Sequence, residues 1–232
     1  MDKQFAENLG IMNKTALSNL QNQTVLLIGL GGLGGFFAQS LARLGIKKVI
    51  LIDPDHFTLS NLNRQCFSHQ ENLGAYKVDV VAEALQKIYP QLEIISYKNR
   101  IQALDNTLFH AVNIIVDATD DITTKLFLET LSTTLKIPLL HGAVGGWFGQ
   151  YGLIEPNQTV LKQLYGSMKK GLEKTQGSPT FTPPIIANLM IATWVAYWLK
   201  KPSFKANVIW LFDALSSSID SFDKVLFDKE RK

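Results

Sequence analysis

The sequence is poor in cysteine, in long apolar runs and in charge of one sign. Its single cysteine, Cys66, excludes an internal disulfide framework and a zinc site built from four cysteines. The longest apolar run, residues 185–199, is interrupted by Asn188 and Thr193 and is shorter than the roughly 20 residues that a membrane span needs. We therefore expect a buried core helix in this segment and no membrane partner.

The charge distribution does not indicate a nucleic-acid-binding protein. A net charge of +3 over 232 residues is weak, and the lysines occur in pairs rather than in a block. Residues 1–20 are polar, with apolar residues at helical spacing, which is unlike a secretory signal. We expect a cytoplasmic location and no nucleic-acid partner.

The composition predicts a substantial core, with 46% hydrophobic and 19% charged residues. The length fits one domain over residues 1–232, beginning with an N-terminal helix within 1–22. Apolar runs of strand length alternate with helical periods, which indicates a mostly parallel sheet covered on both faces. The predicted strands are 24–28, 49–52, 92–97, 113–116, 138–143 and 147–154, and the predicted helices are 5–20, 36–44, 75–89, 123–135 and 184–200.

We therefore predict a Rossmann-like, doubly wound α/β fold. Residues 155–181 show no clear period and are predicted to form a long, mobile loop. Strands near 207–213 and 218–222 are expected to close the chain as an antiparallel extension.

A glycine-rich turn follows the first predicted strand. Gly29, Gly31 and Gly34 come directly after residues 24–28 in the spacing G-x-G-x-x-G. Glycine permits a tight turn and lets the backbone approach a phosphate, while the helix N-terminus offers free N–H groups. Asp53, at the end of the second strand, is placed to accept hydrogen bonds from a ribose. The pattern predicts nucleotide binding and alone favours NAD; the alternative is a tight turn without a ligand.

Two cations follow this nucleotide motif. Arg64 lies past the second strand, and Lys77 lies at the start of the helix predicted over 75–89. A redox dinucleotide site needs no triphosphate clamp, whereas a guanidinium and an ammonium together can bind the β- and γ-phosphates. The pair favours ATP, although either residue alone could serve a surface salt bridge.

Carboxylates follow the strand predicted over 113–116. Asp117, Asp120 and Asp121 lie at its carboxyl end, where open α/β sheets bind ligands. Carboxylates there can hold Mg²⁺ beside phosphates. Capping of the next helix by Asp120 or Asp121 is the alternative, and the two roles can coexist.

Together these motifs resemble the ThiF/HesA/MoeB adenylyltransferases, relatives of the ubiquitin-activating enzymes, and most closely their short HesA-type members. The resemblance covers residues 20–155 well and extends more loosely to the last helix and strands. The matching segments are Gly29-Leu-Gly-Gly-Leu-Gly34, Asp53-x-Asp55, Ser60-Asn-Leu-Asn-Arg-Gln65, Gly74-x-x-Lys77-Val78, Asp117-Ala-Thr-Asp120 and His141–Gln150.

The resemblance implies a role for each matching residue. Arg64, Lys77 and Asp120 would be the catalytic residues, the first two on the phosphates of ATP and Asp120 on Mg²⁺. The C-terminal carboxylate of a small ubiquitin-like sulfur carrier ending in Gly-Gly would attack the α-phosphate, giving an acyl-adenylate and pyrophosphate. A homodimer is also implied. The implied nucleotide-binding residues are Gly29, Gly31, Gly32, Gly34, Asp53, Asp55, Asn61 and Gln65.

The chain departs from the family pattern in four places. Asp121 stands where members commonly have Asn, and residues 1–42 hold no arginine, which many members supply from an N-terminal helix. The C-x-x-C pairs that bind zinc in the family are missing, so no zinc is expected. Cys66 is not at the position of a thioester-forming cysteine, and we expect a small buried residue there and a reaction that stops at the acyl-adenylate.

Two other readings stay open. One is a non-catalytic scaffold of the same fold that binds a ubiquitin-like partner, for which the departures at Asp121 and in the N-terminal helix are the support. The other is an NAD(P)-dependent oxidoreductase, which the glycine motif alone permits.

Overall fold

The computed structural model describes residues 3–166 and 176–222, and an eight-stranded sheet runs through them in the order β3-β2-β1-β4-β5-β6-β7-β8. The strands are β1 Thr24–Ile28, β2 Lys48–Ile52, β3 Glu93–Tyr97, β4 Ile114–Asp117, β5 Leu139–Gly145, β6 Phe148–Ile154, β7 Trp210–Asp213 and β8 Ser218–Ser221. The helices are η1 Lys3–Gly10, α1 Lys14–Gln21, α2 Gly32–Leu44, η2 Leu59–Asn61, η3 Gln70–Asn72, α3 Lys77–Ile88, η4 Ile101–Ala103, η5 Asn106–Phe109, α4 Ile122–Leu135, α5 Val160–Tyr165 and α7 Thr182–Trp198.

The topology confirms the predicted doubly wound fold. Strands β1 to β5 pair in parallel, and the antiparallel strands β6, β7 and β8 extend the sheet at one edge. Strand order reverses at β1, which pairs with β2 on one side and with β4 on the other. Crevices at such a reversal point are where open parallel sheets bind ligands.

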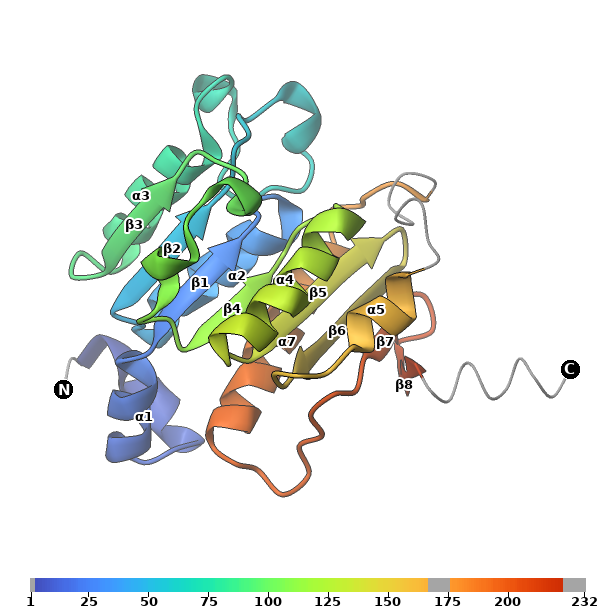
Figure 1. The fold of residues 1–232 in the computed structure, drawn as a ribbon. Coiled ribbons are helices and arrows are strands. Elements are labelled where there is room, and N and C mark those ends of the chain that lie inside the picture. Colours follow the sequence, from blue (N-terminus) through green and yellow to red (C-terminus); the bar gives the residue numbers. More distant parts are fainter. Residues whose placement is uncertain (1–2, 167–175, 223–232) are drawn as a thin grey trace, which may run out of the picture.

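Alternate residues of the central strands serve two separate cores because side chains alternate across a sheet. In β1, Val25 and Leu27 pack in the core on one face, and Leu26 and Ile28 in the core on the other. Helices α2 and α7 cover the first face, and α4 and α5 cover the second (Figure 1). Trp194 of α7 is fully buried, as expected for a core helix in that segment.

Two predicted elements differ from the structure. The single helix expected over 5–20 is divided into η1 and α1, because Asn13 begins a new helix by accepting a hydrogen bond from the backbone N–H of Ala16. The segment 155–181, predicted as a loop, contains α5. Glu129 of α4 accepts hydrogen bonds from the first N–H groups of α5, and this long-range cap has no local signal in the sequence. Residues 167–175 lie outside the described residues.

Helix α7, the longest of the described helices, is 17 residues long, and none of the helices in the described ranges meets the length and hydrophobicity that a bilayer span requires.

Gly34 sets the distance between α2 and the turn that precedes it. A Cβ atom at this position would lie 1.8 Å from the backbone oxygen of Gly29, a contact that no small shift relieves. The third glycine of the motif is therefore a packing requirement.

We expect Gly34→Ala to lower the free energy of unfolding by about 1–3 kcal/mol, since overpacking outweighs the helix propensity gained from alanine. Urea denaturation at neutral pH measures this change. Gly10→Ala is the matched control, because a Cβ there meets no atom within 4 Å. An unchanged stability of Gly34→Ala would contradict the packing argument.

Candidate active site

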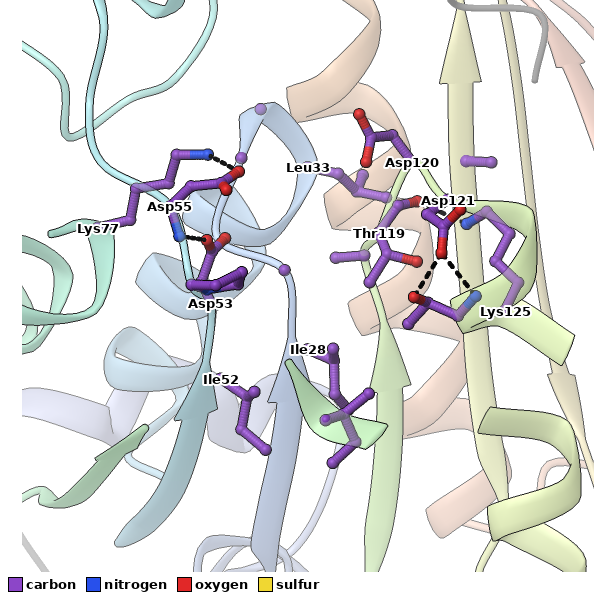
Figure 2. Close-up of a pocket in the computed structure, with 18 of the residues that line it drawn as sticks. Ile28, Leu33, Ile52, Asp53, Asp55, Lys77, Thr119, Asp120, Asp121 and Lys125 are labelled. Carbon is purple, nitrogen blue, oxygen red and sulfur yellow. Dashed lines mark hydrogen bonds and ion pairs between the residues drawn. The ribbon is translucent and has the colours of Figure 1, made fainter. Parts of the chain in front are cut away.

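A cavity of about 490 Å³ lies at the carboxyl ends of β1, β2 and β4, where the strand order reverses. Figure 2 shows its two walls: Asp53, Asp55 and Lys77 on one side, and Asp120 and Asp121 on the other. The volume falls within the usual range of small-ligand sites. The position and size suit a nucleotide.

The glycine turn forms the floor of this cavity. Gly29 has a φ of +88°, a conformation that favours glycine, and its missing Cβ lets it approach the backbone of Ala118. Gly31 caps α2 without any side-chain hydrogen bond, so the first N–H groups of the helix have no capping side chain. Gly31 and Gly32 line the cavity. This end of α2 can therefore accept an anion.

Asp53 fixes the turn from the second strand. Its carboxylate accepts hydrogen bonds from the backbone N–H of Leu30 at 2.6 Å and of Asp55 at 2.8 Å. Burial raises the pKa of Asp53, while Lys77 and these N–H groups oppose the rise. Since an ionised carboxylate has about four acceptor positions, lone pairs remain for ribose hydroxyls.

Lys77 is a buried cation at an electrostatically unfavourable place. It is the first residue of α3, and a positive charge at a helix N-terminus is disfavoured by the helix dipole. Its Nζ forms an ion pair of 3.0 Å with Asp55, whose side chain is largely exposed. An anionic ligand in the cavity would offer this ammonium a second partner.

Arg64 lines the same cavity. Its guanidinium donates to the backbone oxygen of Ser60 and to Asn63, which uses only part of its five donors. Asn63 in turn donates to the backbone oxygen of Ser178 and accepts from Thr180 through its own backbone oxygen. These hydrogen bonds hold Ser178 and Thr180, which precede α7, close to Arg64.

The structure places most of the predicted site residues on the cavity wall, but not all of them. Gln65 lines it, with its side-chain oxygen buried and unpaired among the described residues. Asn61 does not line the cavity. Its side chain accepts from the backbone N–H of Thr58 and its backbone oxygen from that of Arg64, so Asn61 shapes the Arg64 loop. Gly34 also lies outside the lining and acts through packing.

The two carboxylates at the β4–α4 junction have different surroundings. Asp121 caps α4 by accepting from the N–H and hydroxyl of Thr124. Burial alone would raise its pKa, but these hydrogen bonds hold the pKa below its usual value. Asp120 lines the cavity and has no hydrogen-bond or ion-pair partner among residues 3–166 and 176–222. The extra acidic residue is therefore engaged in capping, and Asp120 is available to a ligand.

The donor set at Asp120 suits Mg²⁺ only together with phosphates. Within the described part of the chain, no group of three His, Cys, Asp or Glu side chains can hold a metal ion. Mg²⁺ commonly binds through one or two carboxylates, water and substrate phosphates. One free carboxylate facing a cavity with cations and a helix N-terminus fits that mode.

Sequence reasoning missed several residues of the cavity wall. Arg100 and Gln102 follow β3 and line the cavity, a position that the carboxyl-end rule for parallel strands could have indicated. Lys125 and Ser178 also line it. Nothing local in the sequence assigns these last two to the site.

Cys66 has the environment of a structural cysteine. It is half-buried, and a Cβ on Gly35 would come within 3.2 Å of its sulfur. Burial raises the pKa of its thiol to about 12, so the thiolate is scarce at neutral pH. That Cys66 is not a nucleophile stays a prediction.

Comparison with known proteins identifies the family. Residues 4–231 match the ThiF family. The chain belongs to this family. Among curated ThiF-like relatives, it is 32% identical to the tRNA threonylcarbamoyladenosine dehydratase of Bacillus subtilis over 59% of this chain and 55% of that protein. It is 33% identical to the molybdopterin-synthase adenylyltransferase of Salmonella typhimurium over 63% of this chain and 61% of that protein.

The fold of this ThiF-family chain also matches solved structures. Escherichia coli MccB with ATP has a TM-score of 0.74 and 20% identity over 95% of this chain and 71% of that one. At that identity the likeness shows the fold alone. The chain spans little more than half of the length of these two curated relatives, so the family membership does not by itself establish their activities for this chain.

Asp121 gives a prediction that separates capping from metal binding. Asp121→Ala should lower stability at neutral pH by about 1 kcal/mol, and Asp121→Asn by much less, because Asn is an equally good N-cap. The folded-state pKa of Asp121 is lowered, so the stability that its ionised form contributes is present above its ordinary pKa of 3.8 and is lost as pH falls through the folded-state pKa. Thermal unfolding between pH 2 and 7 measures both effects. Equal losses in the two variants would contradict the capping role.

Proposed function

We propose that this protein uses Mg-ATP to adenylate the C-terminal carboxylate of a small ubiquitin-like sulfur carrier that ends in Gly-Gly, with release of pyrophosphate. The observation that carries the proposal is the gathering of Arg64, Lys77 and Asp120 in one cavity beside the N-terminus of α2. Two cations, one free carboxylate and free helix N–H groups are what a metal-bound triphosphate requires.

Each part of the cavity has a task in this reaction. Asp53 holds the ribose, and the end of α2 receives the phosphates. Arg64 and Lys77 neutralise the charge that develops on the leaving pyrophosphate, and such preorganised stabilisation is often the largest contribution to catalysis. Asp120 would hold Mg²⁺, which would supply neutralisation of the phosphate charge when bound. The carrier's carboxylate attacks the α-phosphorus, and the bond to pyrophosphate breaks.

An exposed aromatic pair beside the cavity supports a polypeptide substrate. Trp147 and Phe181 are 47% and 39% exposed, and their rings are in contact in a tilted arrangement with centroids 4.7 Å apart. Phe181 directly precedes α7 and lies three residues after Ser178, which lines the cavity. Exposed aromatic residues are the type that dominates protein interfaces. A carrier resting on this pair would have its C-terminal tail close to the cavity.

The relatives do not fix the substrate, since one is named for a tRNA modification and another for molybdopterin synthase. The decisive experiment incubates the purified protein with Mg-ATP and a candidate carrier. We expect a carrier mass increase corresponding to AMP, together with exchange of labelled pyrophosphate into ATP. Carrier binding without nucleotide binding would favour the scaffold instead, and binding of NAD without ATP dependence would favour an oxidoreductase.

We also propose a homodimer, as the resemblance to the family implies. Residues 1–42 contain no arginine, so a partner subunit's N-terminal helix would bring only Lys3 or Lys14 to the site. Light scattering of the purified chain tests the dimer separately from the chemistry.

Lys77→Ala should lower the rate of pyrophosphate exchange by about 100-fold or more, the scale seen when one preorganised stabilising group is lost. The fold should persist, because the remaining partner, Asp55, is largely exposed. Lys87→Ala on the same helix is the control, since Lys87 pairs with Glu83 on the surface. Steady-state exchange assays measure both variants. Similar rates for Lys77→Ala and Lys87→Ala would contradict the phosphate role.

Trp147→Ala should raise the KM for the carrier by about tenfold, the effect of removing an interface aromatic worth about 1–2 kcal/mol. ATP affinity should stay unchanged, because Trp147 is absent from the cavity wall. Leu108→Ala is a control. Leu108 is about equally exposed, but it precedes the first residue of β4, whereas the cavity lies at the carboxyl end of that strand. Titration of the carrier at saturating ATP distinguishes the variants. A weaker ATP affinity with an unchanged carrier KM would contradict the docking role.

A further inference from the structure

Lys125 is a buried cation at the cavity wall whose role the proposed chemistry leaves open. It lies in the first turns of α4, and its side chain is 4% exposed. Its ammonium donates to the backbone oxygen of Thr119 at 2.6 Å, to the backbone oxygen of Gly142 at 3.2 Å and to Asp117 at 3.2 Å. An ammonium has three N–H donors, and three acceptors already surround it. Lys125 is thus not a spare cation for phosphate, unlike Lys77.

Asp117 binds the backbone N–H of Thr119, the residue whose carbonyl oxygen Lys125 binds. It is fully buried at the end of β4, and its Oδ1 accepts hydrogen bonds from both the backbone N–H and the hydroxyl of Thr119. Burial alone would raise the pKa of Asp117, but Lys125 and the hydrogen bond from His141 hold it below its usual value. The carboxylate is therefore ionised and fixes the N–H side of Thr119.

His141 and Tyr165 complete a directional chain behind Asp117. Asp117 can only accept, so the Nδ1–H of His141 donates to it at 2.7 Å. Burial and the charge of Lys125 lower the pKa of His141 and outweigh Asp117, which raises it, so the ring is neutral and its Nε2 accepts from the Tyr165 hydroxyl at 3.1 Å. Gln150 then donates to the oxygen of Tyr165. This chain orients Asp117 from the side away from the cavity.

Thr119 is consequently fixed at both of its peptide units. Its N–H is bound by Asp117 and its carbonyl oxygen by Lys125. The carbonyl belongs to the planar peptide that continues into Asp120, so binding the oxygen fixes the backbone nitrogen and Cα of Asp120 as well. Figure 2 shows Thr119 and Lys125 on either side of Asp121 and below Asp120, whose own carboxylate has no partner in the described part of the chain.

We propose that Lys125 is a positioning residue that holds the carboxylate of Asp120 in place for Mg²⁺ by binding the carbonyl of Thr119. The inference rests on the proposed function for its metal and nucleotide, but not for the placement of the loop. It distinguishes two cations of one cavity: Lys77 acts on the ligand, and Lys125 acts on the protein.

The test uses Lys125→Met in the full chain, which keeps the length of the side chain and removes its donors. This change leaves the buried charge of Asp117 without its cationic partner. The double variant Asp117→Asn/Lys125→Met therefore serves as a second variant, which removes both charges together. Tyr165→Phe is the matched control, since it loosens the same network at its far end. Thermal unfolding verifies that each variant is folded.

The first measurement needs no nucleotide. Amide hydrogen exchange of residues 118–121 should become faster in Lys125→Met and in the paired variant, and stay as in the parent protein in Tyr165→Phe. Unchanged exchange of these amides in both Lys125 variants would overturn the proposal, whether or not the protein binds ATP.

The second measurement is the Mg²⁺ dependence of ATP binding, followed by calorimetry. The half-saturating Mg²⁺ concentration should rise by about 10- to 100-fold in the Lys125 variants, the effect of losing a group that orients a metal ligand. Affinity for ATP without Mg²⁺ should change by less than about twofold. In an Asp120→Asn background, Lys125→Met should add no further loss. The proposal would be overturned if Lys125→Met weakened ATP binding equally with and without Mg²⁺, or if it caused the same loss in the Asp120→Asn background. A parent protein that binds no ATP would refute the proposed function instead.

Discussion

The site depends on the close contact of three backbone segments with no side chain between them. Gly29 turns against Ala118 at the end of β4, and Gly34 of α2 packs onto Gly29. A Cβ on either glycine would lie within 2.6 Å of a backbone oxygen. This contact joins the two halves of the sheet where the strand order reverses, and Gly31 and Gly32 at the N-terminus of α2 line the cavity there.

The charged groups in and behind the cavity wall fall into two sets, those paired within the protein and those available to a ligand. Asp117 and Lys125 are hydrogen-bonded to Thr119, and Asp121 is hydrogen-bonded to Thr124. Asp120 has no partner in the described residues, and Lys77 has only an exposed one. Buried charges that are fully paired rigidify their surroundings, whereas partly paired ones remain available to bind. The groups available to a ligand, Asp120 and Lys77, therefore lie on backbone that other, paired residues hold in place.

This division also bears on one departure from the family pattern, the acidic residue at position 121. Asp121 adds a second carboxylate next to Asp120, but the capping of α4 turns it toward Thr124 and away from competition for a cation. Cys66 lies next to the Arg64 loop yet packs against α2. Neither residue disturbs the geometry that ATP would need, so the chain is compatible with catalysis and not only with a scaffold role.

The sequence by itself determined the alternation of strands and helices in the central sheet, the glycine turn and the position of Asp53 and Asp120 at one edge of that sheet, because these features follow from local periodicity and from the rule that parallel strands gather their carboxyl ends at one edge. The charges of Arg64 and Lys77 and the family resemblance added these two residues to the predicted site. Only the tertiary structure decided that Asn61 shapes a loop, that Glu129 caps α5, and that Lys125 braces Thr119. These roles are hydrogen bonds whose partners depend on how side chains from separate elements are packed together, and no local pattern in the chain encodes such a pairing.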